Sequence, residues 1–325
     1  MSKSTSVTGI GSAIVDILSY VGDEFLTTHE LPKGGMMLID EARAKSLYKT
    51  LGQTTECSGG SVANTLAGIA SLGSNPAFIG KVASDQLGEI FTHDMRSVGV
   101  AFSTPATTGG PATANCLICV TPDAQRTMAT YLGACTGLSE IDMDESVIAA
   151  AQVLYIEGYQ WDMEAAKKAI RKAIAIAKKH GTKVALTLSD TFCVERFRDE
   201  FNALINTEVD ILFANESELL SLTQETDFNT AVKKLQGRVE VAAITRSEKG
   251  AVIVTKDKAE AIAGEVVAKL VDTTGAGDLF AAGFLYGYTQ GWANEKSAAL
   301  GNQCAAEIIQ QLGARAMKPL NKLVA

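Results

Sequence analysis

The stretch VDTTGAGDLFAAGF, residues 271 through 284, sets a glycine-rich turn directly before an apolar run. The turn consists of Gly275, Ala276 and Gly277, with Asp278 after it. The apolar residues that follow recur at helical spacing, so the pattern predicts a tight turn that leads into a helix. Backbone N–H groups at the start of that helix would converge on one spot, where the helix dipole favours negative charge. We therefore expect an anion-binding turn.

Asp278 has two interpretations, and the residue by itself leaves both open. An aspartate in the first turn of a helix commonly acts as a cap and complements the helix dipole. Beside an anion-binding turn, a carboxylate also suits a base that takes a proton from an alcohol attacking a phosphoryl group. The dinucleotide-binding pattern GxGxxG is excluded, because Phe280 stands where the third glycine belongs. The turn therefore favours a kinase that acts on a hydroxyl.

A second glycine pair opens another predicted helix, in CSGGSVANTLAGIASLG, residues 57 through 73. Gly60 lets a ligand approach the backbone closely, and Ser61 and Asn64 lie one turn apart, where both can face the loop. Asn64 offers a donor and an acceptor to the hydroxyls of a sugar. A glycine pair is also a common connector between elements, and this alternative stays open.

Two acidic positions are candidates for binding. Asp16 lies in the apolar strand SAIVDIL, so it either faces solvent or accepts hydrogen bonds from vicinal hydroxyls. In ANESEL, residues 214 through 219, Asn215 and Glu218 follow a strand at i, i+3 spacing. They can orient a hydrated Mg²⁺ beside phosphate, with Glu218 acting indirectly through water. The same spacing is that of a capping box, which stays open as the alternative.

Short apolar runs alternate with amphipathic helical patterns along most of the chain, which predicts a parallel sheet covered by helices on both faces. The predicted strands are residues 7–17, 77–83, 153–158, 183–189, 211–216 and 241–247, with a further short strand just before the turn at Gly275. The clearest helix is predicted over residues 161–182. In such sheets ligands bind beyond the carboxyl ends of the strands, where the glycine turn at 275 falls.

Residues 18–40 and 104–134 break this alternation, because they carry strand and turn signals without a convincing helix between the strands. Within the second segment, CLICV and TMATYL are joined by TPDAQR and indicate a hairpin. We predict a small β-rich lid from these two segments. Residues 1–17, 41–103 and 135–325 then form one large α/β domain that binds nucleotide and substrate.

Composition excludes several classes of protein. The 325 residues carry a formal net charge of −8, which argues against nucleic acid or an anionic membrane as partner. No apolar run approaches the ~20 residues of a membrane span, and the N-terminal segment does not resemble a secretory signal, so we expect a cytoplasmic protein. The six cysteines are scattered and there are three histidines, which disfavours a zinc site or a histidine-based triad.

Taken together, the motifs resemble those of a known family. DTTGAGDLFAAGF is similar to the C-terminal signature of the ribokinase-like (PfkB) carbohydrate and nucleoside kinases, GGSVANTLAGIASLG to their N-terminal signature, and NESE to their NxxE motif. The resemblance spans nearly the whole chain in the right order. It implies a three-layer α/β/α sandwich with a mostly parallel central sheet and a small β-rich lid. It also implies Mg-ATP as the donor and a hydroxymethyl group as the acceptor.

Within the family the chain looks most like the adenosine kinase branch. GSAIVDI is similar to the opening strand of that branch, and GGMMLID and RTMATYLGA to its two lid segments. The acceptor contacts implied by this resemblance are Ser12, Asp16, Gly60, Ser61 and Asn64 for the ribose, Met37 and Leu38 from the lid, and Tyr159 and Phe192 for the base. Arg126 would lie where phosphate charge develops. Ordinary packing remains the alternative for the two aromatic rings.

The donor side is assigned by the same resemblance. ITRSEKGAVIV resembles the family's nucleotide loop, in which members often carry Gly where Arg246 or Ser247 stands. The ATP-binding residues implied are Asn215, Thr245, Gly250, Gly277 and Asn302. Some relatives also hold a monovalent cation such as K⁺ behind the loop, here near Asp272 and Thr274.

The sequence keeps three hypotheses of function. The first is an ATP-dependent kinase of the 5′-hydroxyl of a nucleoside, adenosine above all, which would serve purine salvage, with Asp278 as base. The second is the same machinery acting on a free sugar such as ribose or fructose, which would favour polar groups over Met37, Tyr159 and Phe192. The third is a catalytically silent nucleotide- or sugar-binding protein, against which the intact GAGD and NxxE motifs argue. Monomer and homodimer are equally compatible with the sequence.

Overall fold

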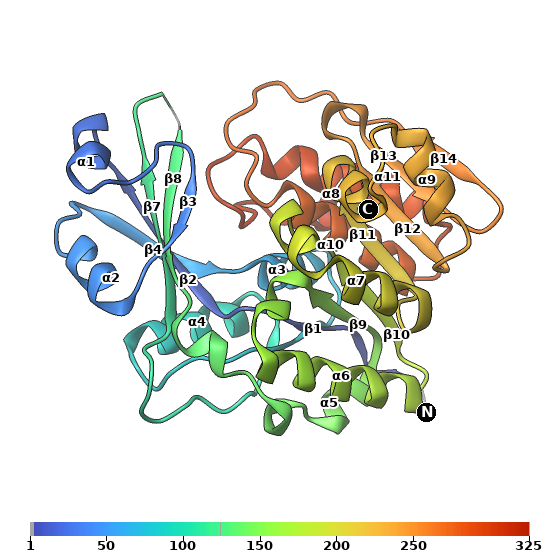
Figure 1. Cartoon of the computed structure of the whole chain (residues 1–325), viewed down its shortest axis with the longest axis horizontal. Helices are drawn as coiled ribbons and strands as arrows, with labels where there is room; N and C mark the ends of the chain where they lie inside the picture. Colours follow the sequence, from blue (N-terminus) through green and yellow to red (C-terminus); the bar gives the residue numbers. More distant parts are fainter. Residues whose placement is uncertain (1–2, 124, 325) are drawn as a thin grey trace.

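The computed structural model describes residues 3–123 and 125–324 and contains two sheets (Figure 1). The larger sheet has nine strands in the order β14 (Ala259–Ile262), β13 (Ala251–Val254), β12 (Val241–Thr245), β11 (Ile211–Asn215), β10 (Lys183–Thr187), β9 (Ala151–Glu157), β1 (Thr5–Ile10), β5 (Ala77–Ile79) and β6 (Ala101–Phe102). From β12 to β6 neighbouring strands are parallel, whereas β13 and β14 pair antiparallel. The mostly parallel central sheet is therefore confirmed.

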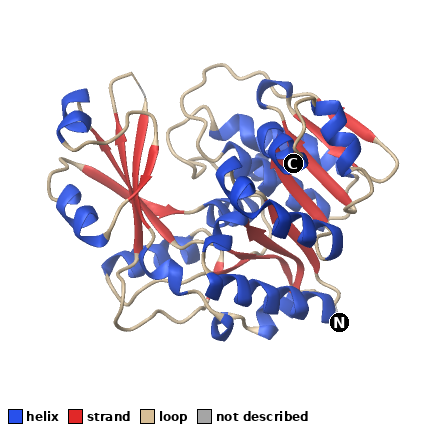
Figure 2. Cartoon of the chain, viewed as in Figure 1, coloured by secondary structure: helices blue, strands red, loops and turns tan. Residues whose placement is uncertain are grey.

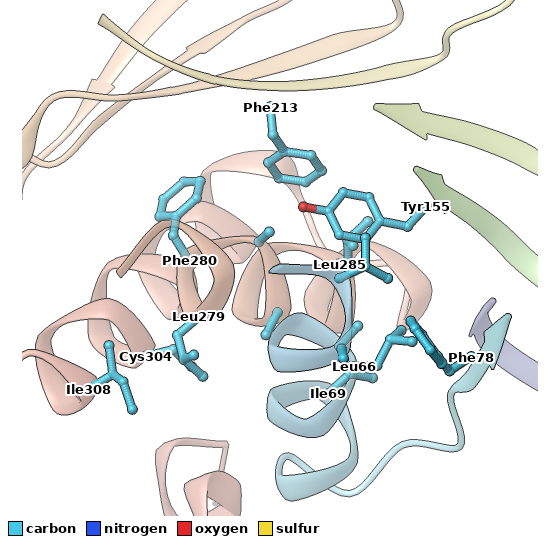
Figure 3. Close-up of a cluster of buried hydrophobic side chains, with 14 of the residues drawn as sticks. Leu66, Ile69, Phe78, Tyr155, Phe213, Leu279, Phe280, Leu285, Cys304 and Ile308 are labelled. Carbon is cyan, nitrogen blue, oxygen red and sulfur yellow. The ribbon is translucent and has the colours of Figure 1, made fainter. Parts of the chain in front are cut away.

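Helices cover both faces of this sheet. They are α3 (Ser61–Ser71), α4 (Gln86–Ser97), α5 (Glu145–Ala150), α6 (Glu164–Lys179), α7 (Thr191–Thr207), α8 (Glu216–Thr223), α9 (Phe228–Leu235), α10 (Ala276–Thr289) and α11 (Asn294–Ile308), whereas α1 (Asp23–Thr28) and α2 (Glu41–Tyr48) lie beside the smaller sheet (Figure 1). Because successive side chains of a strand point to opposite faces, Val153 and Tyr155 of β9 join a core with α3, α10 and α11. Leu154 and Ile156 join a second core with α6, α7, α8 and α9. Figure 3 shows part of the first core, with α3 beside α10.

The smaller sheet, which contains strands from both segments predicted to form the lid and which we call the lid sheet, stands beside this sandwich, as Figure 2 shows. Its five strands follow the order β3 (Met36–Leu38), β8 (Arg126–Tyr131), β7 (Ala114–Val120), β2 (Ile14–Tyr20) and β4 (Thr54–Gly59). Val15 and Ile17 lie on the face that packs against α1, α2 and α4, which we call the outer face. Ile14, Ile118 and Met128 lie on the opposite face, which we call the inner face.

The predicted hairpin is confirmed, because β7 and β8 pair antiparallel; Ala124 in its turn lies outside the described residues. Residues 14–17 and 54–59, which the sequence assigned to the large domain, instead form strands of the smaller sheet. β4 escaped prediction because TTECSG has no alternating apolar residues. The short helix α1 was likewise unexpected within residues 18–40. The division into a domain and a lid stays a prediction.

The single strand predicted over residues 7–17 is two strands in two sheets. β1 ends at Ile10 and β2 begins at Ile14, so the chain crosses from the larger to the smaller sheet between them. Glu157 explains the break, because its carboxylate accepts a hydrogen bond from the backbone N–H of Ser12 at 2.8 Å. That N–H is thereby withdrawn from both strand ladders.

The strand predicted just before the turn at Gly275 does not form. The N–H groups of Val271 and Asp272 donate instead to the carbonyl of Ile309, after the end of α11, at 2.8 and 3.2 Å. The long predicted helix is α6 and is shorter than expected, because residues 158–162 form a separate 3-10 turn before it. None of the helices in the described part of the chain combines the length and apolar character that a membrane span needs.

Candidate active site

The two predicted glycine turns lie next to each other, each at the N-terminus of a helix. Gly275 precedes α10 with φ of 77° and Gly60 precedes α3 with φ of 93°, and L side chains rarely adopt such backbone. α3 packs against α10, which brings the two helix ends together. The N–H of Ala276 donates to the carbonyl of Thr273 at 3.2 Å. The N–H groups that follow it at the start of α10 have no partner within the helix and are available to an anion.

Asp278 faces α3 across the junction of the two turns. Its carboxylate accepts a hydrogen bond from Ser61 Oγ at 2.6 Å and another from Asn64 Nδ2 at 2.9 Å. Burial raises the pKa of Asp278 to about 6; the hydrogen bonds from Ser61 and Asn64 lower it, the charge of Glu157 raises it and that of Arg315 lowers it. Both oxygens thus bond to α3 rather than to the end of α10, so Asp278 makes no capping hydrogen bond, although it lies in the first turn of α10, where its charge complements the helix dipole.

Two cavities meet at this turn. The first, of about 360 Å³, is lined by residues of β12, α10 and α11, and we call it the α11 cavity. The second, of about 440 Å³, includes residues at the start of α3 and from the lid sheet, and we call it the α3 cavity. Five residues line both cavities: Thr245, Thr273, Ala276, Gly277 and Phe280. The turn that precedes Asp278 is therefore a wall between two adjoining cavities.

Most residues predicted to bind ATP line the α11 cavity, namely Thr245, Gly250, Gly277 and Asn302. Asn302 Nδ2 donates to the carbonyls of Ile262 and Ala263, at 3.3 and 2.8 Å, and so holds the edge of the cavity. Ser247 also lines the cavity and has φ of 52°. This left-handed conformation explains why glycine suits the nucleotide loop there. Asn215, by contrast, lines the α3 cavity.

The residues predicted to meet the ribose divide into two groups. Asp16, Gly60, Ser61 and Asn64 line the α3 cavity. Burial raises the pKa of Asp16 to about 6, while the charges of Arg126 and Arg315 lower it and that of Asp278 raises it. Ser12 lies elsewhere: its hydroxyl donates to Glu157 at 2.8 Å and accepts from Gln160 at 2.7 Å. This geometry does not support the predicted contact of Ser12 with an acceptor, because its hydroxyl already has buried partners.

The lid residues need a correction that follows from strand geometry. Met37 pairs with Ala129 of β8 and packs in the core on the outer face of the lid sheet. Since adjacent residues of a strand point to opposite faces, Met36 and Leu38 lie on the inner face, where they are 52% and 58% exposed. The place of Met37 on the outer face does not support its predicted contact with the substrate, whereas Leu38 lies on the inner face as Met36 does, and Met36 pairs there with Met128.

The two predicted aromatic residues also differ. Tyr159 lines the α3 cavity, and its hydroxyl donates to the carbonyl of Ser189 at 3.4 Å. Phe192 is the second residue of α7 and is 72% exposed, outside the residues that line the cavity. The alternative that Phe192 packs in the core is therefore wrong, and the contact of Phe192 with a base stays a prediction.

Asn215 and Glu218 form the capping box that the sequence left as an alternative. Asn215 Oδ1 accepts from the N–H of Glu218, and the carboxylate of Glu218 accepts from the N–H of Asn215 at 3.0 Å and from its Nδ2 at 2.6 Å. Burial raises the pKa of Glu218 to about 7. Both residues nevertheless line the α3 cavity, so the capping role does not remove them from the site.

Arg126, at the start of β8, joins the lid sheet to the loop before the glycine turn. Its Nη1 donates to Asp272 Oδ2 at 2.5 Å and also to Thr274 Oγ1. The Nε of Arg126 is buried and has no hydrogen-bond partner among the described residues. Asp272 further accepts from the N–H of Thr274 at 3.0 Å and of Gly313 at 2.8 Å. A monovalent cation near Asp272 stays a prediction, and it would have to share this carboxylate with Arg126.

Sequence reasoning missed several residues that shape the site. Met128, Tyr155 and Phe213 line the α3 cavity, but in the sequence they are ordinary apolar residues of strands. Glu157 is 1% exposed and accepts hydrogen bonds from Ser12 and from the N–H of Val62 at the start of α3. A carboxylate inside the apolar run VLYIEG was the available signal for Glu157, as it was for Asp16.

Comparison with known proteins agrees with the geometry. Residues 30–321 match the pfkB family of carbohydrate kinases. The chain belongs to this family. PfkB kinases are phosphotransferases that use ATP and act on a hydroxyl group, and the ribokinase-like fold of this chain is the fold of that family.

Three pfkB kinases illustrate the similarity. The chain is 48% identical to the adenosine kinase of Sinorhizobium meliloti, with a TM-score of 0.92 and 99% of each chain covered. It is 47% identical to a probable sugar kinase of Rhizobium etli CFN 42, with a TM-score of 0.92 and 100% of this chain and 98% of the other covered. A 5-dehydro-2-deoxygluconokinase of Lacticaseibacillus casei is 30% identical over 82% of this chain and 85% of its own length. The names of these pfkB kinases thus include both nucleoside and sugar acceptors.

Proposed function

We propose that this pfkB kinase transfers the γ-phosphoryl group of ATP to the 5′-hydroxyl of adenosine and forms AMP. The observation that carries the proposal is the place of Asp278. Its carboxylate is oriented by Ser61 and Asn64 directly after a turn that lines two adjoining cavities. Phosphoryl transfer depends mainly on positioning and on charge stabilisation, so a donor and an acceptor on either side of this turn meet its requirements.

The residues of the turn have complementary roles in the proposed reaction. The acceptor oxygen forms a bond to the γ-phosphorus, the bond to the β-phosphate oxygen breaks, and ADP leaves. Asp278 takes the proton of the hydroxyl as this happens. The free N–H groups at the start of α10 stabilise the negative charge on the transferring group. The Nε–H of Arg126, which has no partner within residues 3–123 and 125–324, supplies a further cationic donor once phosphate is bound.

The chemistry of Glu218 fits a magnesium ion held through water. Each oxygen of its carboxylate accepts a hydrogen bond from Asn215, and a carboxylate oxygen keeps a further lone pair for a water molecule. Mg²⁺ prefers oxygen ligands and retains several waters, so an indirect contact suffices. We propose that Glu218 holds the hydrated ion in this way, where it would neutralise phosphate charge.

The lining of the α3 cavity supports a nucleoside over a free sugar. Met128, Tyr155, Tyr159, Phe213 and Phe280 line it together with the polar residues around Asp278. Aromatic and apolar walls suit the face of a purine, whereas Asp16, Ser61 and Asn64 offer partners to ribose hydroxyls. The 48% identity to an adenosine kinase points the same way.

A sugar kinase remains the second candidate. The pfkB relatives named as sugar kinases include one that is 47% identical to this chain. A free sugar would use the hydroxyl-binding residues near Asp278 and leave the aromatic side of the cavity without a partner. The two candidates therefore differ in whether Tyr159 contributes to acceptor binding.

A coupled assay of ADP release tests the proposal across adenosine, inosine, ribose and fructose at equal concentrations. We expect the two nucleosides, and adenosine above all, to give a higher kcat/KM than the free sugars, because a nucleoside fills both the polar and the aromatic parts of the α3 cavity and a free sugar fills only the polar part. The Asp278→Asn variant measures the background of ATP hydrolysis in each case. Turnover of a free sugar at low concentration without turnover of adenosine would overturn the nucleoside assignment and leave the kinase assignment intact.

A further inference from the structure

Gly313, Ala314 and Arg315 follow α11 and touch both glycine turns; we call these residues the C-terminal strap. The N–H of Gly313 donates to Asp272 Oδ2 at 2.8 Å. Ala314 packs against Gly275 so closely that a Cβ on Gly275 would lie 2.7 Å from the Cβ of Ala314. The strap therefore braces the loop that carries Asp278.

Arg315 reaches the other glycine turn. Its Nε donates to the carbonyl of Ser58 at 3.0 Å, its Nη2 to Ser58 Oγ at 3.0 Å, and its Nη1 to the carbonyl of Ala63 at 2.9 Å. Ser58 belongs to β4 of the lid sheet and Ala63 to the first turn of α3. The guanidinium thus spans the turn at Gly60, where the lid sheet joins α3. A planar group with five N–H donors suits acceptors in such fixed directions.

Nη2 of Arg315 also donates to Met95 Sδ at 3.4 Å, and all four acceptors are neutral, so the positive charge of Arg315 acts on the nearby carboxylates of Asp16, Asp94 and Asp278. Burial raises the pKa of both Asp16 and Asp278, and the charge of Arg315 lowers both. Other charges act on the same pair. Glu157 raises the pKa of Asp278, while Asp278 raises and Arg126 lowers that of Asp16. Arg315 thus opposes the effects of burial and of the neighbouring carboxylates.

We propose that Arg315 is a positioning residue for phosphoryl transfer. By holding the start of α3 through Ser58 and Ala63, it keeps Ser61 and Asn64 where they orient the Asp278 carboxylate. The hydrogen bonds that Arg315 supports join α3 to α10. Ser61 and Asn64 lie 217 and 214 positions before Asp278 in the sequence. The inference rests on the kinase reaction of the family and not on the identity of the acceptor.

Kinetics of Arg315→Met and Arg315→Lys test the proposal against a matched control. Arg198 donates to the carbonyl and the hydroxyl of Ser221, at 2.9 and 3.4 Å, as Arg315 does to Ser58, but it joins α7 to α8. We expect Arg315→Met to lower kcat by about 10²-fold with little change in the KM for ATP, because a small displacement of catalytic groups costs that much. Arg198→Met should keep the wild-type kcat. A kcat of Arg315→Met equal to that of Arg198→Met would overturn the proposal.

The pH profile separates positioning from a merely structural role. In Arg315→Met the acid limb of kcat should move to higher pH than in the wild type and in Arg198→Met, because a cation that lowers the pKa of Asp278 is lost. Arg315→Lys keeps the charge but not the planar donor set, so its acid limb should stay while kcat falls by about tenfold. This variant carries the test if Arg315→Met does not fold. A wild-type kcat in Arg315→Lys would contradict the need for the guanidinium.

Amide hydrogen exchange without substrate makes the test independent of the acceptor. Residues 58–64 and 273–278 should exchange faster in Arg315→Met than in Arg198→Met, because the strap no longer holds both turns. Unchanged exchange in both segments would overturn the proposal. If the wild-type protein phosphorylates none of the acceptors tested, the proposed function fails, whereas the exchange experiment still decides the role of the strap.

Discussion

The α11 cavity and the α3 cavity share a wall but are built differently. Every residue that lines the α11 cavity falls within residues 245–309, on the larger sheet, its helices and the loops between them. The lining of the α3 cavity runs from Asp16 to Phe280 and includes Asp16 and Met128 of the lid sheet. The proposed donor side is thus formed within the sandwich alone, while the proposed acceptor side depends on how the two sheets are placed relative to each other. Selectivity for the acceptor is therefore expected to reside in the lid, and ATP binding in the sandwich.

Asp278→Asn should have the largest effect, because Asp278 follows the wall that both cavities share. We expect kcat to fall by about 10²-fold or more, with the KM for ATP nearly unchanged, since the substituted side chain can no longer take a proton. Steady-state kinetics check this. Asp227→Asn is the control, because Asp227 caps α9 through the N–H of Thr230, away from both cavities. Near-normal turnover of Asp278→Asn would remove Asp278 from the role of base.

Lowering the pH should have the second largest effect, because it protonates Asp278. The pKa of Asp278 is raised to about 6, so the ionised base is lost as the pH falls through 6, and kcat should drop with a slope that approaches about tenfold per pH unit below it. The pH dependence of the free energy of unfolding has the opposite sign to that of kcat. The folded-state pKa lies above the ordinary value of 3.8, so the charge of Asp278 destabilises the fold increasingly as the pH rises through 6. Asp278→Asn should consequently raise Tm more at pH 8 than at pH 5, and an equal gain at both would contradict the raised pKa.

Gly250→Ala should impair the donor side alone. Gly250 has φ of 83°, and a Cβ there would lie 2.2 Å from the carbonyl oxygen of Ile262. The nucleotide loop would have to shift, so we expect the KM for ATP to rise by about tenfold while the KM for the acceptor stays near its wild-type value. Gly237→Ala is the control, because its φ is 78° but its Cβ would lie 3.7 Å from Lys256 Cγ. An equal rise in both KM values would show that the two cavities are not independent.

The smallest expected effect distinguishes the two faces of the lid. Leu38→Ala removes apolar surface from the inner face, so the KM for the acceptor should rise about fivefold with little change in Tm. Met37→Ala removes packing from the outer face and should lower Tm without changing that KM. Kinetics and thermal unfolding of the two variants check the assignment. The reverse pattern would place Met37, and not Leu38, toward the substrate.

Prediction from the sequence succeeded where a local pattern has one physical meaning. Apolar runs that alternate with amphipathic helices indicated a parallel sheet covered on both faces, and the hairpin was recognisable from its turn residues. It failed where long-range contacts decide. Glu157 breaks the strand predicted over residues 7–17, and the carbonyl of Ile309 takes the N–H groups of the strand expected before Gly275. β4 pairs with β2 without any alternating apolar pattern of its own.

The sequence alone determines that the glycine turn at residues 275–277, with the carboxylate of Asp278 beside it, lies at the N-terminus of a helix. Such a turn depends only on the local backbone conformation and on the helix dipole. Tertiary structure alone decided what Asp278 does there, since its partners Ser61 and Asn64 come from a helix more than two hundred residues away in sequence. It also decided that Leu38 rather than Met37 lies on the inner face, because pairing with β8 sets the register of β3. Neighbouring residues determine the local backbone conformation, whereas the orientation of side chains in the site depends on which distant elements pack together.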